Sequence, residues 1–459
     1  MNTVLPLIVV VAYVLLLTTV ALRARAARHF SEFSLARRTL PLALVFGSLA
    51  ATYVGPGFSI GFVGKGFNSG FLFWVVGLAY AAQNITVGLL VAPKLRALKN
   101  CHTLGDAFGQ KYDRTSQVLA GLVSVGVCAG LAAVMAKAGG DVIKTMFNLP
   151  KWSSIVIVVG ITAIYTTFGG LRASVVTDAF QFAAFALLLP LALAVTLLFH
   201  VSAPDFTSEA AAATRTGFGS ASTVQIVGLI TAFLLGETLI PPYANRALAS
   251  KTTAVSRGGF VLAGLFSAVW FAVMIGLGIT ARLILPGTPP EDQVLIDLIR
   301  STMPAAGYAL LLVALLSVIM SSLDSLLNAG AVAFTQDIVK PFKNITDTTA
   351  LKIGRSATIV VAATAALGAV AVDSIISGLL ICYTIWAPAI LPALIIGLWI
   401  KHPRPLAAIL SMAAGTAVAV GFEFLYQPPV HLPAIIPALA ASLLAYAASH
   451  HILKPEHGA

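Results

Sequence analysis

The sequence predicts an all-α polytopic membrane protein with about 13 transmembrane helices, on the basis of three observations. Hydrophobic residues make up 58% of the 459 residues, and charged residues make up only 10%, where about 25% is usual in soluble domains. Apolar runs long enough to cross a bilayer recur along the chain. The Lys and Arg residues cluster between alternate runs. This pattern excludes soluble enzymes, disordered proteins and secreted disulfide scaffolds.

The apolar runs define the expected helices in order. The first run, 4–22, is uncharged and is not preceded by Lys or Arg, so we expect a retained helix rather than a signal peptide. The further spans are expected at 40–63, 68–92, 116–146, 152–168, 174–199, 223–245, 256–282, 304–333, 353–372, 376–400, 403–424 and 432–450. The longest external stretch, 200–222, is rich in Ala, Ser and Thr and is expected to be a loop. A second external segment, 291–303, is expected to form a short helix.

The distribution of cations indicates the orientation. An external N-terminus places most of the 28 Lys and Arg residues, Arg246 among them, in inner segments when the sides alternate. The C-terminus is then cytoplasmic, and we expect a multi-pass protein of the plasma (inner) membrane. Because topology accounts for the net charge of +11, the lipid bilayer rather than nucleic acid is the expected partner.

A glycine–proline–glycine triplet interrupts the second span near its middle. The triplet consists of Gly55, Pro56 and Gly57. Proline has no N–H and glycine tolerates non-helical torsions, so we expect the helix to unwind here. Unwinding frees carbonyl groups between Ala51 and Val54, which can bind a cation. The alternative is a simple proline kink, or close packing of helices through the small residues.

The span 223–245 contains a similar interruption. Glu237 lies between Gly236 and Thr238, and two prolines follow at 241 and 242. Interrupted helices in corresponding positions of two halves indicate an inverted-repeat transporter with its site at the membrane midplane.

The ninth span presents oxygen atoms on one helix face. Residues at i, i+3 and i+4 share a face, which groups Val318, Ser321 and Ser322, and also Ser321, Asp324 and Ser325. Serine hydroxyls beside a carbonyl suit a small hard cation. Alternatively, the serines bond back to carbonyls four residues earlier. That alternative accounts poorly for Asp324, because a mid-helix carboxylate costs about 2.5–3.5 kcal/mol on insertion scales.

Taken together, these segments resemble the sodium/solute symporter family over roughly residues 30–400. The motifs that carry the resemblance are LAATYVGPGFSIG, TLGDAFGQKYD, IYTTFGGLRASVVTDAFQ, IPPYANRALASK and SVIMSSLDSLLNAGAVAFTQDIVKP. The resemblance implies a LeuT-like fold of two inverted five-helix repeats, with the first and sixth core helices broken. The implied units are an extra N-terminal helix and cytoplasmic loop (1–39), the two repeats (40–200 and 201–400), and two C-terminal helices with a short tail (401–459). Family members take up sugars, proline, pantothenate, sialic acid, choline or carboxylates with sodium.

The resemblance also implies ligands for the coupling ion, Na⁺. One sodium in the family lies between the broken helix and the ninth span. Its ligands here would be the carbonyls of Ala51, Val54 and Val318 and the hydroxyls of Ser321 and Ser322. Some members use a second sodium farther inward, at positions that match Asp178, Ser321, Asp324 and Ser325. From the residues alone, Asp178 can equally be an interfacial acid that pairs with Arg172 or a loop cation.

Two charged residues bear on the solute. Lys137 lies on a helix that lines the cavity in this fold, and Glu237 lies at the second break. Together they suit a zwitterion such as an amino acid; Lys137 alone suits a carboxylate, and Glu237 alone an amine. Alternatively, Lys137 snorkels to the outer interface and Glu237 hydrogen-bonds unwound backbone. The other expected solute contacts are Gly55, Pro56, Gly57, Phe58, Tyr383 and Trp386.

We therefore expect a sodium-coupled secondary active symporter that imports a small organic solute by alternating access. The solute would be of the amino acid, carboxylate or amine type. A proton-coupled symporter of the same fold and a non-transporting sensor of a solute or ion are the alternatives. The sequence has no HExxH or P-loop motif, so an enzyme is not expected.

Overall fold

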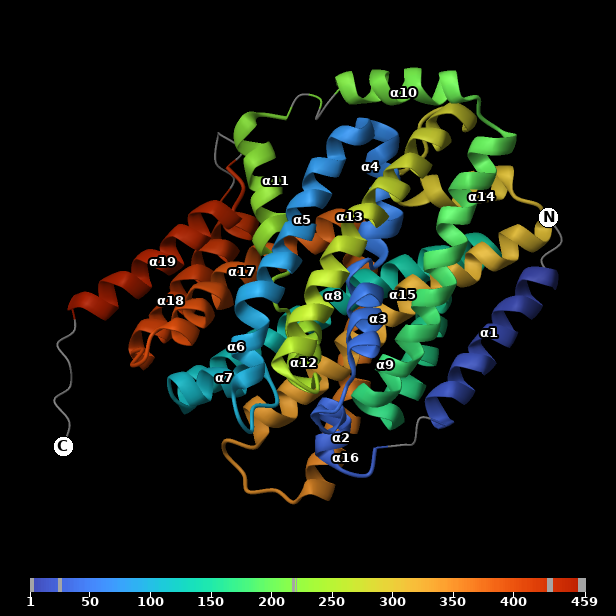
Figure 1. Cartoon of the computed structure of the whole chain (residues 1–459). Helices are drawn as coiled ribbons and strands as arrows, with labels where there is room; N and C mark the ends of the chain where they lie inside the picture. The colour runs from blue at the N-terminus through green and yellow to red at the C-terminus, as the bar shows by residue number, and fades with distance from the viewer. Residues whose placement is uncertain (1–3, 24–26, 217–218, 220, 427–431, 453–459) are drawn as a thin grey trace, which may run out of the picture.

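The computed structural model describes residues 4–23, 27–216, 219, 221–426 and 432–452, and these residues are almost entirely helical (Figure 1). Their only β contact is an isolated bridge between Leu40 and Ser250. Most of the short tail expected at the C-terminus, 453–459, lies outside the described residues.

The α-helices follow one another with short connections. In the first half of the chain they are α1 (Val4–Arg23), α2 (Phe30–Leu35), α3 (Leu42–Tyr53), α4 (Phe62–Ser69), α5 (Trp74–Thr86), α6 (Ala92–Ala97), α7 (Leu104–Lys111), α8 (Arg114–Phe147), α9 (Lys151–Phe199) and α10 (Ala203–Thr216). In the second half they are α11 (Thr223–Leu235), α12 (Pro241–Ala249), α13 (Thr253–Ile284), α14 (Val294–Thr302), α15 (Ala305–Ala333), α16 (Asp347–Gly368), α17 (Ile375–Trp399), α18 (Pro405–Val420) and α19 (Ile435–Ile452).

Short 3₁₀ and π segments join or extend several of these helices. The 3₁₀ segments are η1 (Ala36–Arg38), η3 (Gly70–Phe73), η5 (Glu291–Gln293) and η7 (Ala369–Ala371). The π segments are η2 (Gly57–Gly61), η4 (Val87–Val91), η6 (Phe334–Val339) and η8 (Gly421–Leu425).

The expected spans all overlap helices. Within the described residues, 9 helical stretches are long and apolar enough to cross a membrane, and some contain parts of two expected spans, as Lys151–Phe199 does. Three shorter apolar helices, Leu42–Tyr53, Thr223–Leu235 and Ile435–His450, cover further expected spans. The membrane-spanning helical class is confirmed, and the number of 13 crossings stays a prediction.

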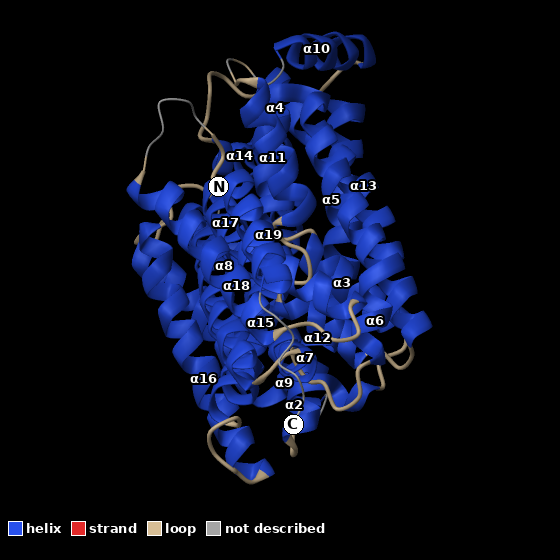
Figure 2. Cartoon of the chain, turned by 90° about the vertical axis from the view of Figure 1, so that its left-hand side faces the viewer, coloured by secondary structure: helices blue, strands red, loops and turns tan. Residues whose placement is uncertain are grey.

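The two segments expected outside the membrane differ in structure. The stretch 200–222, expected to be a loop, contains the helix α10, so that expectation is wrong. Its alanines are strong helix formers, which explains the difference. The short helix expected within 291–303 is confirmed by η5 and α14. The helix α10 lies at one end of the molecule and α2 at the other (Figure 2).

The helix α15 is the centre of the molecule. In its most apolar window 94% of residues are buried, against 28% for α1. It packs against α1, α8, α9 and α16, and also against α3 and α12 beside the two expected breaks. A helix buried on all sides can carry polar groups only where its neighbours satisfy them, so its serines and aspartate point to a built site.

Gly170 divides the long helix α9 into two segments. Its torsions, φ 60° and ψ −162°, are non-helical and lie where only glycine is readily accommodated. A Cβ atom at this position would lie 2.7 Å from Cα of Phe33 in α2. The break therefore falls between the expected spans 152–168 and 174–199.

We expect Gly170→Ala to lower the thermal unfolding temperature of the purified protein. The left-handed torsion costs about 1–3 kcal/mol for a non-glycine residue, and α2 must also move. Gly160→Ala in the same helix is the matched control, since a Cβ there meets nothing within 4 Å. Equal unfolding temperatures for the two variants would contradict the strain at Gly170.

Candidate functional site

The first broken helix is confirmed at the predicted place. The helix α3 ends at Tyr53, and Val54 has non-helical torsions, φ −97° and ψ 35°. The chain passes through Gly55 before Pro56 starts the next helical segment. A Cβ atom on Gly55 would lie 2.7 Å from Oγ of Ser322 in α15, so glycine allows the break and α15 to approach closely.

The second broken helix is confirmed between α11 and α12. The connection includes Leu239 at a φ of 51°. Two side chains donate hydrogen bonds to Thr238, which lies within this connection. The indole of Trp386 donates to the Thr238 carbonyl at 2.8 Å, and the amide of Gln83 donates to its hydroxyl at 2.5 Å. Trp386 thus stabilises the non-helical connection between α11 and α12.

Backbone carbonyls and serine hydroxyls meet between α3 and α15. Ser321 Oγ donates to the Ala51 carbonyl at 3.2 Å, and Ser322 Oγ donates to the Thr52 carbonyl at 3.4 Å. Both hydroxyls also lie within 3.3 Å of the Val318 carbonyl. All of these groups are buried. All of these ligands are oxygen atoms, which suits a small hard cation such as Na⁺. In transporters with broken helices, the backbone carbonyls of the unwound segment coordinate such ions.

The predicted ligand Val54 lies in a neighbouring network. Its carbonyl accepts a 2.6 Å hydrogen bond from Ser59 Oγ, which in turn accepts one from Trp270 at 3.1 Å. The carbonyl of Thr52, which the sequence did not single out, is the one that reaches Ser322. The carbonyl of Thr52 could have been predicted as a ligand, because Thr52 lies within the stretch from Ala51 to Val54 whose carbonyls the break frees.

Arg246 contacts residues that were predicted to bind the second sodium ion. This arginine lies in a segment expected on the inner side, and its side chain is fully buried. Its Nη2 lies 3.2 Å from Asp178 Oδ2 and donates to Ser325 Oγ, while its Nε donates to Ser48 Oγ at 3.0 Å. A guanidinium can make several such bonds at once because its donors form a fixed fork.

Asp324 lies in the same network through hydroxyl groups. Its Oδ1 accepts hydrogen bonds from Ser174 at 3.0 Å and from Ser325 at 3.1 Å. The structure therefore brings together three of the predicted residues, Asp178, Asp324 and Ser325, around a cation of the protein itself. The sequence signal for Arg246 was a single charge in the short, otherwise uncharged segment after the second break.

We expect Arg246→Met to lower the free energy of unfolding by about 3–5 kcal/mol, because it leaves Asp178 buried without its counter-charge. Thermal unfolding measures this, and Arg257→Met, at an exposed position of α13, is the control. Adding Asp178→Asn to Arg246→Met should recover part of the loss. Equal stability of the two single variants would show that the buried pair does not stabilise the fold.

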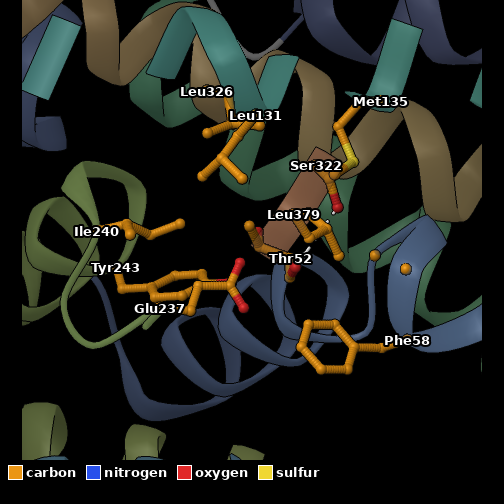
Figure 3. A pocket seen from close by; sticks show the side chains of 12 residues that line it. Thr52, Phe58, Leu131, Met135, Glu237, Ile240, Tyr243, Ser322, Leu326 and Leu379 are labelled. Carbon is orange, nitrogen blue, oxygen red and sulfur yellow. Dashed lines mark hydrogen bonds between the residues drawn. The ribbon is translucent and has the colours of Figure 1, made fainter. Parts of the chain in front are cut away.

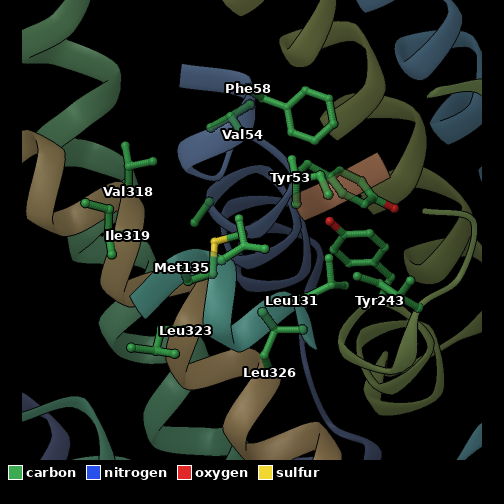
Figure 4. Close-up of a cluster of buried hydrophobic side chains, with 14 of the residues drawn as sticks. Tyr53, Val54, Phe58, Leu131, Met135, Tyr243, Val318, Ile319, Leu323 and Leu326 are labelled. Atoms are coloured by element: carbon green, nitrogen blue, oxygen red, sulfur yellow. The ribbon is translucent and has the colours of Figure 1, made fainter. Parts of the chain in front are cut away.

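A cavity lies between the two breaks and beside Ser322 (Figure 3). Its cavity volume is about 20 Å³, which is close to the space that one water molecule needs. Its lining residues are Thr52, Gly55, Gly57, Phe58, Leu131, Met135, Glu237, Ile240, Tyr243, Ser322, Leu326 and Leu379. The apolar side of this region is formed by residues of α3, α8 and α15 (Figure 4). Four predicted solute contacts, Gly55, Gly57, Phe58 and Glu237, line the cavity, whereas Pro56, Tyr383, Trp386 and Lys137 do not.

Lys137 forms ion pairs with carboxylates instead. Its Nζ lies 3.0 Å from Asp141 and also pairs with Asp292 in η5. Asp292 additionally accepts a 3.1 Å hydrogen bond from the N–H of Ile375 at the start of α17. The amine of Lys137 is thus engaged by carboxylates of α8 and η5, and its contact with solute stays a prediction.

Two broken helices around a central cavity, with oxygen ligands beside it, define a membrane transporter of LeuT-like fold. The model of the sodium:solute symporter family matches residues 33–415, and the chain belongs to that family. Members of the family are sodium-coupled transporters rather than enzymes, so Na⁺ is the coupling ion.

Three known proteins illustrate the likeness in sequence or fold. The sodium/pantothenate symporter of Escherichia coli (strain K12) is 24% identical over 468 residues, covering 97% of this chain and 95% of the relative. A Na⁺-coupled sialic acid symporter, solved in a substrate-bound outward-open state, has a TM-score of 0.85 at 16% identity, with 98% of both chains covered. A nucleobase-cation-symport-1 family transporter, closed around bromovinylhydantoin, has a TM-score of 0.60 at 13% identity, with 92% and 96% covered.

Proposed function

We propose that the protein imports a small organic solute together with sodium by alternating access. The observation that carries this proposal is the convergence of Ala51, Val318, Ser321 and Ser322 beside a cavity formed by both helix breaks. An ion at these oxygens contacts α3 and α15 at once, so it can favour the conformation in which the two helices lie close together. The solute binds next to it, at the breaks.

Sodium binding is coupled to solute transport because the two conformations of the transporter differ in their affinity for sodium. Sodium shifts the conformational equilibrium only by as much as it binds one conformation more tightly than the other. When the transporter opens inward, sodium leaves into a cytoplasm of low sodium concentration. Each net positive charge carried inward gains about 2.3 kcal/mol per 100 mV of membrane potential.

The topology is part of the proposal. We place the protein in the plasma (inner) membrane with its N-terminus outside and its C-terminus in the cytoplasm, and α10 and η5 outside. The repeats are taken as 40–200 and 201–400, flanked by 1–39 and 401–459. The cation distribution of the sequence supports this orientation.

We propose one sodium ion as the coupled ion. A second ion held by Asp178, Asp324 and Ser325 requires Arg246 to move, since its guanidinium already bonds to Asp178 and Ser325. Moving a buried guanidinium away from its acceptors is costly, because the donors and the carboxylate both lose their partners.

The test is thermal unfolding of the purified protein in NaCl against KCl at equal ionic strength. A ligand that binds only the folded state stabilises it by RT ln(1+[L]/Kd), so a sodium-specific rise measures the site. We expect Ser321→Ala to raise the Kd for sodium about tenfold or more, since a bond to a charged group contributes about 1.5–3 kcal/mol.

Ser317→Ala is the matched control, because Ser317 is buried on the same helix but bonds to Tyr13 at 2.7 Å. It should leave the sodium response unchanged. A sodium rise that survives in Ser321→Ala, or an equal rise in KCl, would contradict the proposed ion site. A response to pH without sodium would instead support proton coupling.

A further inference from the structure

Glu237 is a buried carboxylate without a complete set of partners. The residue is 6% exposed, and its Oε2 atom has no hydrogen-bond partner among the described residues. It lies in the second break and points into the cavity toward Thr52 and Leu379 (Figure 3). A buried charge is retained only where a counter-charge or hydrogen bonds compensate its lost hydration.

The described part of the protein supplies no counter-charge to Glu237. Its twelve-residue cavity lining contains no Lys, Arg or His. The two buried cations among the described residues are engaged elsewhere: Lys137 with Asp141 and Asp292, and Arg246 with Asp178. A counter-charge for ionised Glu237 must therefore come from a bound molecule.

Sodium at the proposed ion site does not supply the missing counter-charge of Glu237. Sodium bound by Ser321, Ser322 and the carbonyls of α3 would neutralise freed backbone dipoles, and no carboxylate belongs to that set of oxygens. A solute whose only charge is a carboxylate would meet Glu237 as a like charge in a dry cavity. Such like-charge contact is strongly unfavourable at low local dielectric.

Aromatic rings surround the same carboxylate. The hydroxyl groups of Tyr80, Tyr243 and Tyr383 face Glu237. Tyr80 packs on Phe58 and Tyr243 on Tyr53, each with ring centroids 4.2 Å apart. An ammonium group, including an alkylated one, is attracted both to a carboxylate and to aromatic faces, and desolvation strengthens the attraction.

We propose that the transported solute carries a positively charged nitrogen, which Glu237 binds at the second break. This inference rests on the proposed function and narrows the solute to amines and zwitterions, excluding solutes that are only anionic or neutral. Glu237 holds the ammonium group, the tyrosine hydroxyls orient the carboxylate, and Phe58 with Tyr243 covers the apolar part of the solute. The paired Lys137 takes no part in this contact.

The experiment is a thermal-shift titration of the purified full-length protein in saturating NaCl. The probes are choline, glycine betaine and L-proline, which carry a charged nitrogen, against pantothenate, propionate and D-glucose, which do not. We expect stabilisation by at least one nitrogen-bearing probe and by none of the others. Glu237→Gln should weaken that response at least tenfold while the sodium response is retained.

Two further variants separate binding from structural damage. Glu237→Asp keeps the charge and should recover part of the response to the nitrogen-bearing probe. Asp141→Asn removes a carboxylate that faces Lys137 rather than the cavity and should leave the response unchanged. Stabilisation by pantothenate, propionate or glucose, or an undiminished response in Glu237→Gln, would overturn the inference.

The outcomes distinguish this inference from the proposed function. A sodium-specific shift with no shift from any nitrogen-bearing probe would overturn the amine assignment and leave sodium coupling standing. Absence of the sodium shift itself would reject the proposed ion site, whatever the probes do.

Discussion

The close contact between the first helix break and α15 is the constraint on which the site depends. Carbonyls of a regular helix are used within the helix, so an ion can bind them only where the helix is interrupted. The interruption at Gly55 frees the carbonyls of Ala51 and Thr52, and the missing side chain lets Ser322 approach. Because α15 is buried on all sides, its hydroxyls have few other partners, and the two elements complete each other.

The charged groups of the interior fall into three arrangements with different consequences. Arg246 and Asp178 compensate each other without any exposure to solvent, which holds α12 and α9 together beside the site. Lys137 binds two carboxylates and connects α8 to η5. Glu237 has no counter-charge among the described residues. In an interior without water, Glu237 is therefore the charged residue available to a ligand. The ion pairs of Arg246 and Lys137 stabilise the helices around it.

Much of the fold could be predicted from the sequence because membrane insertion makes composition informative. The apolar runs, the two interruptions and the oxygen face of α15 follow from hydropathy, from proline and glycine, and from helical periodicity. The helix α10 was missed because a hydropathy reading treats an Ala, Ser and Thr stretch as a loop, although alanine favours helix. Boundaries within α9 were predicted correctly only because the glycine at 170 coincides with a local rise in polarity.

The sequence by itself determined the class of the protein and the places where helices break, and it supplied the residue types of the proposed ion site, since each depends on local chemistry. Tertiary structure alone decided which charges are paired. Arg246 reaches Asp178 across 68 residues and Lys137 reaches Asp292 across 155, and no local pattern encodes such distances. Electrostatic compensation is a property of three-dimensional proximity, so the solitary state of Glu237 could be recognised only after the positions of both cations were known.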